Sequence, residues 1–282
     1  MGIILAILLF SAIIIIHELG HFLLAKANGI RVDEFSLGLG PTLFGKQFGE
    51  TKFSVKLLPF GGACMMGEDD VEDISEGSFN SKSVWARMSV IVAGPLFNLI
   101  LAWILCMIMI AWVGYRTPVV GGVIDGYSAQ EQGLSEGDVI TKIGGRSVHI
   151  WNDISLYNLT HSEEKEVEIT YKRDGKTHTA VLEPRQKEGD TAPLLGVTGG
   201  KMERPGFFGT LKYGAYTVKY WIDYTVDSLR MLVTGRVGMK DLSGPVGIVS
   251  AVDGVYQEAA PAGLSVIILN LVNIGILITD HN

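Results

Sequence analysis

The chain has 282 residues, of which 48% are apolar and 19% are charged, and its mean hydropathy is +0.31. This composition is too apolar for an ordinary soluble domain and too charged for a protein that lies wholly in lipid, so we expect membrane spans joined to at least one water-exposed domain. The net charge of −7 argues against a nucleic-acid partner.

The first predicted element is a membrane span over residues 1–25, in which Glu18 is the only charged side chain. About 24 helical residues cover a hydrocarbon core of about 30 Å at about 1.5 Å per residue. Lys26 and Arg31 follow the span at once, whereas no Lys or Arg precedes it. The positive-inside rule therefore places the N-terminus outside and the next segment in the cytoplasm.

The apolar run of this span contains the motif His17-Glu18-Leu19-Gly20-His21. Histidines four residues apart share one face of a helix, so both imidazoles can reach one cation, and Glu18 can take a proton from a metal-bound water. Two histidines leave room for a third protein ligand and a water, which is the arrangement of a catalytic zinc site. The alternative is a helix end with interfacial histidines and a Glu that snorkels to the surface.

The polar segment over residues 26–86 is predicted to be cytoplasmic and to carry a membrane-associated β-loop. Residues 35–41 have the pattern of a strand that runs into a turn, and residues 52–59 that of a strand ended by Phe60-Gly61-Gly62. Two interpretations stay open, a strand pair that dips into the bilayer beside the metal site and a plain cytoplasmic hairpin. The edge of this predicted strand pair is also suited to pairing with an extended peptide.

A second span is predicted over residues 87–115, because residues 88–115 carry no charge and lie between Arg87 and Arg116. Gly94 and Pro95 permit close helix approach and a local kink. Asn98 is a lone amide in this apolar run, and an ordinary interhelical hydrogen bond and a role at the active site are both open for it.

Residues 116–186 are predicted to form a small β-rich domain outside the cytoplasm. Its expected elements are a strand at 119–124, a short helix at 128–132, a strand that begins near 139, a turn at Gly144-Gly145 and a hairpin centred on Asp174-Gly175. At about 70 residues, such a domain is near the lower size limit for an independent core.

Residues 187–261 are predicted to hold a linker and an amphipathic helix that lies on the membrane surface. The helix is expected over residues 206–235. Its spacing suggests an apolar, mostly aromatic stripe, formed by Tyr213, Tyr216, Tyr220, Tyr224 and Leu232. A third span is expected to begin within residues 262–282. The predicted fold class is therefore a polytopic α-helical membrane protein with an inserted small β-rich soluble domain.

Several stretches together resemble the site-2 protease family, in its bacterial RseP/RasP-like branch of intramembrane zinc metalloproteases. They are the histidine motif at 17–21, the glycine-rich strands at 35–41 and 59–62, Ala93-Gly94-Pro95-Leu96-Phe97-Asn98, the segment 133–140, which looks like part of a single PDZ domain, and Ser243-Gly244-Pro245-Val246-Gly247-Ile248. The resemblance covers nearly the whole chain, and the order of the motifs makes it specific.

The chain departs from the family pattern at the third zinc ligand, an Asp in a Leu-Asp-Gly motif of the third span. Asp253 lies in Val-Asp-Gly before that span, and Asp280 lacks the flanking pattern. We therefore expect that the chain is truncated, that Asp280 is not the ligand, and that this chain by itself is a poor or inactive enzyme.

The resemblance implies an intramembrane endopeptidase in the bacterial cell membrane, with zinc held by His17 and His21 and with Glu18 as the general base. Candidate substrate-binding residues are Gly61, Gly62 and Asn98. Expected substrates are transmembrane proteins, such as membrane-anchored regulators of the anti-sigma-factor kind, or remnant signal peptides. Two alternatives are a membrane-bound PDZ scaffold with a non-catalytic zinc and a membrane-anchored zincin that cuts soluble proteins.

Overall fold

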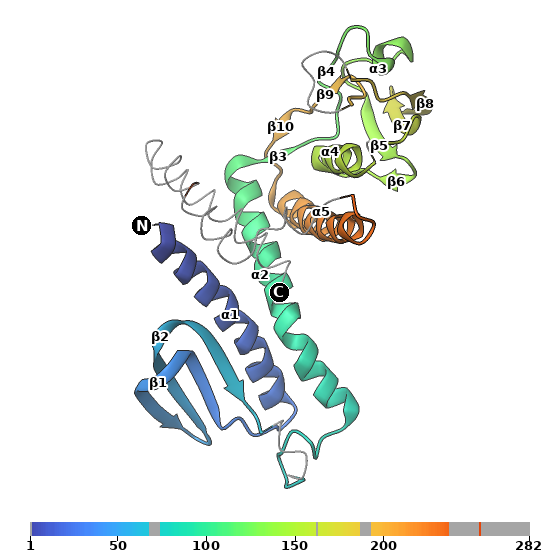
Figure 1. Cartoon of the computed structure of the whole chain (residues 1–282). Coiled ribbons are helices and arrows are strands. Elements are labelled where there is room, and N and C mark those ends of the chain that lie inside the picture. The colour runs from blue at the N-terminus through green and yellow to red at the C-terminus, as the bar shows by residue number, and fades with distance from the viewer. Residues whose placement is uncertain (1, 68–73, 162, 187–192, 237–253, 255–282) are drawn as a thin grey trace. The chain divides into compact units, whose positions relative to one another are not determined.

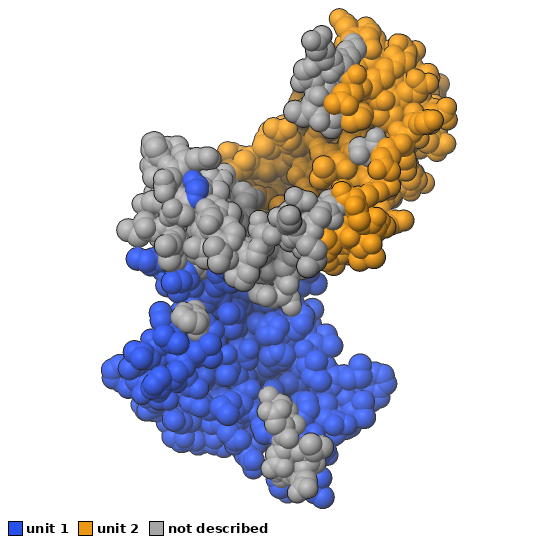
Figure 2. Space-filling model, viewed as in Figure 1, with its two compact units in different colours: residues 1–105, 242–282 blue, residues 106–241 orange. Residues whose placement is uncertain are grey.

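The computed structural model describes the chain except for residues 1, 68–73, 162, 187–192, 237–253 and 255–282 (Figure 1). The chain divides into two compact units, residues 1–105 with 242–282 and residues 106–241 (Figure 2). The expected third span, Asp253 and Asp280 lie outside the described residues.

Two long apolar helices dominate the first unit and its border. Helix α1 runs from Gly2 to Ala27, and α2 runs from Val84 to Val113 with Pro95 inside it. In the described part of the chain, Ile7–Ala27 and Val84–Val113 are long and apolar enough to cross a membrane. Both predicted spans are therefore helices of sufficient length, and Pro95 does not end the second one.

A curled antiparallel pair of strands, β1 (Glu34–Phe48) and β2 (Thr51–Met65), lies beside α1 (Figure 1). The predicted turn after residue 40 and the predicted strand end at residues 60–62 are both wrong, because each strand continues through its glycines. Leu37 pairs with both Val55 and Gly62, so the long strands bend back on themselves. Gly38 and Gly61, each with φ of 85°, supply the backbone geometry for these irregularities.

The strand pair packs on the second half of α1. Rings of Phe22, Phe35 and Phe53 meet with centroids 5.3 to 5.9 Å apart. These rings adjoin a buried cluster formed by Ala25, Ile30, Val32, Phe35, Cys64, Met66, Phe79 and Val90. Nearer the start of α1, Ser11 donates a hydrogen bond to the Pro59 carbonyl at 2.5 Å. β2 therefore follows α1 along much of the apolar helix.

The second unit contains a four-stranded sheet in the order β6-β5-β7-β8. Its strands are β5 (Val139–Ile143), β6 (Arg146–Ser147), β7 (Val167–Arg173) and β8 (Lys176–Leu182), and the short helix α3 spans Ser128–Glu131. The expected hairpin is confirmed, since β7 and β8 pair throughout around Asp174 and Gly175, both with positive φ.

Two features of this unit differ from the sequence prediction. Helix α4 (Trp151–Thr160) was not expected, and the Asp153 carboxylate accepts hydrogen bonds from the backbone N–H groups of His149 and Ile150 at its start. The domain also extends past residue 186, because two short strands from the predicted linker pair with strands near its start. These pairs are β9 (Val197–Thr198) with β4 (Gly122–Val123) and β10 (Met202–Glu203) with β3 (Tyr115–Arg116).

Helix α5 (Phe207–Val233) is amphipathic, but its tyrosines do not form the expected outward stripe. Tyr213, Tyr216 and Tyr220 pack against a cluster within the unit, and Tyr216 stacks on His149 with ring centroids 3.9 Å apart. These three tyrosine rings pack inside the unit because β3 and the start of α4 place aromatic and aliphatic side chains against their face of α5. The exposed apolar residues in the second half of α5 are instead Ile222, Val226, Leu229 and Val233.

An ion pair joins α5 to the sheet of the same unit. Asp227 is buried, and its carboxylate accepts two hydrogen bonds from the Arg146 guanidinium at 2.5 and 3.1 Å. This bidentate contact holds the pKa of Asp227 below its ordinary value. Because Asp227 occupies the same side of the helix as the packed tyrosines, it fixes which face of α5 is turned away from the domain.

Candidate metal centre

Two histidines of α1 form the nucleus of the candidate site. His17 and His21 lie one helical turn apart, with ring centroids 4.8 Å apart and ring planes at 76°. Both side chains are half-buried, as is Glu18 between them. The helical spacing thus brings two imidazoles and a carboxylate together inside the apolar helix.

The free edges of both imidazoles point at one position on α2. A methyl group added at Gly94 would lie 2.4 Å from His21 Nε2 and 2.6 Å from His17 Nε2. Only a residue without a side chain leaves this space open. One turn of α1 is also in close contact with α2, since a methyl group at Gly20 would lie 2.5 Å from the Ala93 carbonyl oxygen. The two glycines therefore permit the close approach that creates the space between the histidines.

The opposite ring edges are held by α2. His21 Nδ1 lies 2.7 Å from the Val90 carbonyl oxygen, which can only accept a hydrogen bond. Nδ1 therefore carries the proton, and Nε2 is left as a free base that faces Gly94. His17 Nδ1 lies 3.2 Å from Asn98 Nδ2. Val90, Gly94 and Asn98 are spaced by four residues, so they share the face of α2 that meets the histidines.

Glu18 is approached by the glycine segment of β2. A methyl group at Gly62 would lie 3.5 Å from Glu18 Cγ and 3.8 Å from Ile14 Cγ2. Gly61, with φ of 85°, is packed instead against the Leu39 side chain. The structure thus brings Glu18 next to Gly62, which sequence reasoning singled out from a distant part of the chain, whereas Gly61 contacts the strand pair.

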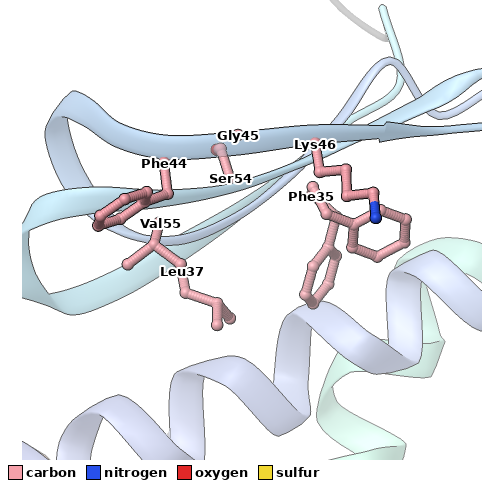
Figure 3. A pocket seen from close by; sticks show the side chains of 8 residues that line it. Phe35, Leu37, Phe44, Gly45, Lys46, Ser54 and Val55 are labelled. Carbon is pink, nitrogen blue, oxygen red and sulfur yellow. The ribbon is translucent and has the colours of Figure 1, made fainter.

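A pocket of about 400 Å³ lies in the strand pair of the same unit (Figure 3). Phe35 and Leu37 line it from the start of β1, and Figure 3 shows both side chains pointing toward the helix below. Phe44 and Val55 lie side by side on its other wall. The lining is mainly apolar and contains no histidine or carboxylate, so this pocket offers a contact for apolar groups and holds no metal ligand.

The two imidazole nitrogens that converge on Gly94 suit zinc, since zinc is commonly bound by histidine nitrogen. His17 and His21 would hold the metal through Nε2, because both nitrogens converge on Gly94. Within the described ranges, no group of three or more His, Cys, Asp and Glu side chains lies close enough to hold a metal ion. The described part of the chain therefore supplies two ligands of the three that a catalytic zinc site uses.

Sequence reasoning named the two histidines and Glu18 as candidates but did not assign the contact atoms on α2. Gly94 was expected only to permit close packing, and Val90 was not singled out. The four-residue spacing of Val90, Gly94 and Asn98 was the available signal, because it places a small residue and an amide on one helix face.

Comparison with known proteins places the chain in a family. The model of "Peptidase family M50" matches residues 5–282. A protein of Clostridium acetobutylicum, provisionally named a zinc metalloprotease, is 38% identical over 262 residues, which are 93% of this chain and 76% of that protein. The regulator of sigma-W protease RasP of Bacillus subtilis is 29% identical over 362 aligned positions, covering 95% of this chain and 85% of its own.

One solved structure is similar to part of the chain. The PDZ domain of an SdrC-like protein from Listeria monocytogenes shares 28% identity and covers 30% of this chain and 88% of its own, with a TM-score of 0.25. The family match, by contrast, extends over almost the full length and includes the histidine pair of α1. The chain therefore belongs to peptidase family M50, and it is a zinc metalloendopeptidase of the RasP-like, site-2 protease type.

Proposed function

We propose that the chain cleaves peptide bonds within the transmembrane segments of membrane-anchored proteins. The observation that carries this proposal is the convergence of His17 Nε2 and His21 Nε2 on Gly94, next to Glu18, within a helix long enough to cross a membrane. A site for water and a metal inside an apolar helix pair is costly to maintain, and a hydrolase that acts at this depth explains it.

Glu18 is the group of this chain that moves protons in the proposed reaction. Zinc, when bound, polarises a water molecule and the scissile carbonyl. Glu18 takes a proton from the water molecule as the water oxygen bonds to the carbonyl carbon. It returns that proton to the leaving nitrogen as the C–N bond breaks. His17 and His21 orient the reacting groups and undergo no net change.

The strand pair supports a substrate that is extended rather than helical at the cleavage site. Peptide carbonyls in a helix are engaged in hydrogen bonds, so a transmembrane helix must unwind before hydrolysis. Gly62 brings the β2 backbone close to Glu18, where an unwound segment can lie alongside. Exposed apolar side chains of the strand pair favour a membrane-associated loop over a plain cytoplasmic hairpin. They are Leu39, Leu43, Phe44, Phe48, Val55, Leu57, Leu58 and Met65.

The class of substrate is proposed from the relatives and from the second unit. The Bacillus subtilis relative is named "Regulator of sigma-W protease RasP", and we propose from this name that the substrates of this chain are membrane-anchored regulators of transcription factors. We place the β-rich unit outside the cytoplasm of a bacterial cell, as a PDZ-like domain that selects trimmed substrates. The exposed row of Ile222, Val226, Leu229 and Val233 supports contact of α5 with the membrane surface.

The decisive experiment separates hydrolysis from metal binding. Glu18→Gln keeps the shape of the side chain, so we expect unchanged zinc content and loss of cleavage of a single-span substrate in proteoliposomes. His17→Ala is expected to lose the zinc as well, and Glu76→Gln, at an exposed position before α2, serves as the control. Cleavage by Glu18→Gln at the normal rate would refute the assigned role, and cleavage only outside the span would point to a surface protease.

A further inference from the structure

Asn98 is a buried amide whose only hydrogen-bonding neighbour in the described part of the chain is a candidate metal ligand. The residue is 1% exposed, and its Nδ2 lies 3.2 Å from His17 Nδ1. Its other polar atom, Oδ1, has no partner among the described residues. Among the described residues, the Asn98 amide therefore hydrogen-bonds to the histidine alone, and this favours a function at that ring.

The partner of His21 shows what a metal-binding imidazole needs at this position. The Val90 carbonyl accepts a hydrogen bond from the N–H of His21 Nδ1, so the ring proton is on Nδ1 and His21 Nε2 is left without one. The same requirement applies to His17, whose Nε2 faces the same point near Gly94. A neutral imidazole carries one ring proton, so Nδ1 of His17 must hold it if Nε2 is to bind a cation.

The orientation of the Asn98 amide decides between the two forms of His17. With Nδ2 toward Nδ1, the imidazole accepts a hydrogen bond and its proton sits on Nε2, where it blocks coordination. Rotating the amide by 180° occupies the same volume and brings Oδ1 to the ring, where it accepts a hydrogen bond from the N–H of Nδ1. The second orientation reproduces at His17 what the Val90 carbonyl does at His21.

We propose that Asn98 is a positioning residue that accepts a hydrogen bond from His17 Nδ1 in the zinc-bound protein and so fixes His17 Nε2 as the ligand atom. This assignment rests on the proposed metal site, and it replaces the expected substrate contact of Asn98. Outer hydrogen-bond partners of metal-bound histidines usually change metal affinity by about 10- to 100-fold when they are removed.

Two substitutions test whether the side chain at position 98 acts on His17 as a hydrogen-bond acceptor or as a donor. Asn98→Leu keeps a similar volume without polar atoms, and Asn98→Asp keeps an acceptor oxygen without the amide donor. We expect zinc affinity, measured by competition with a chromophoric chelator in detergent, to fall by about 10- to 100-fold in Asn98→Leu. Asn98→Asp should remain within about threefold of the wild type, because the hydrogen bond to Nδ1 is retained.

A matched control removes a different polar contact of α2. Ser89 accepts a hydrogen bond from Asn28 Nδ2 at 3.1 Å and donates one to the Ala86 carbonyl. Ser89→Ala should therefore bind zinc as tightly as the wild type, which shows that loss of an ordinary polar contact of α2 is not sufficient. Helical circular dichroism of each variant reports whether it has folded.

A measurement on the wild type removes the dependence on mutant folding. Nitrogen NMR of ring-labelled histidine in the zinc-loaded chain should show a proton on His17 Nδ1 and none on Nε2. A proton on Nε2, or a folded Asn98→Leu variant with wild-type zinc affinity, would overturn the role of Asn98 while leaving the metal site in place. Wild-type chain that binds no more zinc than His17→Ala would overturn both the metal site and this inference.

Discussion

The substitution Gly94→Ala tests the metal centre with a single methyl group. That methyl would lie 2.4 Å from His21 Nε2 and 2.6 Å from His17 Nε2, whereas ordinary contact begins at 3.4 Å. Each imidazole must therefore retreat by about 1 Å, which exceeds the tolerance of about 0.2 Å in metal–ligand distances. We expect the variant to retain its fold and to lose zinc.

The magnitude follows from two opposing effects of the methyl group. Overpacking of a tight contact costs about 1–3 kcal/mol, while Ala in place of Gly favours the helix by about 1 kcal/mol. The global stability should thus change by no more than about 2 kcal/mol. The strain falls on the two ligand atoms and must be overcome for binding, so zinc affinity should fall by at least about tenfold, since tenfold corresponds to about 1.4 kcal/mol.

Zinc competition titrations and thermal unfolding, both on the purified chain in detergent, check these two expectations separately. Ala102→Val is the matched control, because Ala102 is a fully buried position two turns further along α2. It should lower the unfolding temperature without a comparable loss of zinc. If Gly94→Ala bound zinc as tightly as the wild type, the convergence of the two histidines on this point would not be the metal position.

Three further outcomes concern the second unit. Gly144→Ala should destabilise this unit by about 1–3 kcal/mol more than Gly175→Ala in chemical denaturation. Both substitutions place alanine at a positive φ, but only the methyl at Gly144 would clash with the Tyr157 hydroxyl of α4, at 1.9 Å. Equal losses of stability would contradict this packing. Because the pKa of Asp227 is lowered in the folded protein, its carboxylate contributes stability above about pH 4, and this contribution is lost as the pH falls through the folded-state pKa. Asp227→Asn should therefore flatten the dependence of the unfolding temperature on pH in the acid range. An unchanged dependence would count against the ion pair. A cysteine at Ser147 should react with an impermeant thiol reagent outside intact cells and one placed at residue 76 should not, whereas the reverse labelling would invert the proposed topology.

Local sequence determined the parts of this protein that depend on neighbours in the chain. The four-residue spacing of His17 and His21 fixes one helix face, and the uncharged run of α2 fixes a long apolar helix. Asp174 and Gly175 adopt positive φ at low cost, so the hairpin they form was predictable. None of these features requires knowledge of a distant segment.

Contacts between distant segments were decided only by the tertiary structure. β1 continues past Gly40-Pro41 because β2 offers it a partner over that stretch, and the pattern of one strand does not contain this information. Likewise, an amphipathic sequence shows that α5 has two faces but not which one meets protein. The structure shows that Tyr213, Tyr216 and Tyr220 pack within the unit.

The metal centre divides in the same way. The sequence determined that two imidazoles and a carboxylate lie on one turn of α1, because helical periodicity is a local property. Only the packing of α1 against α2 determined that both Nε2 atoms converge on Gly94 and that the Asn98 amide lies against His17 Nδ1. Such contacts join residues 69 and 81 positions apart in the chain. They depend on the distance and rotation of the two helices, which are fixed by close packing of side chains rather than by either helix alone.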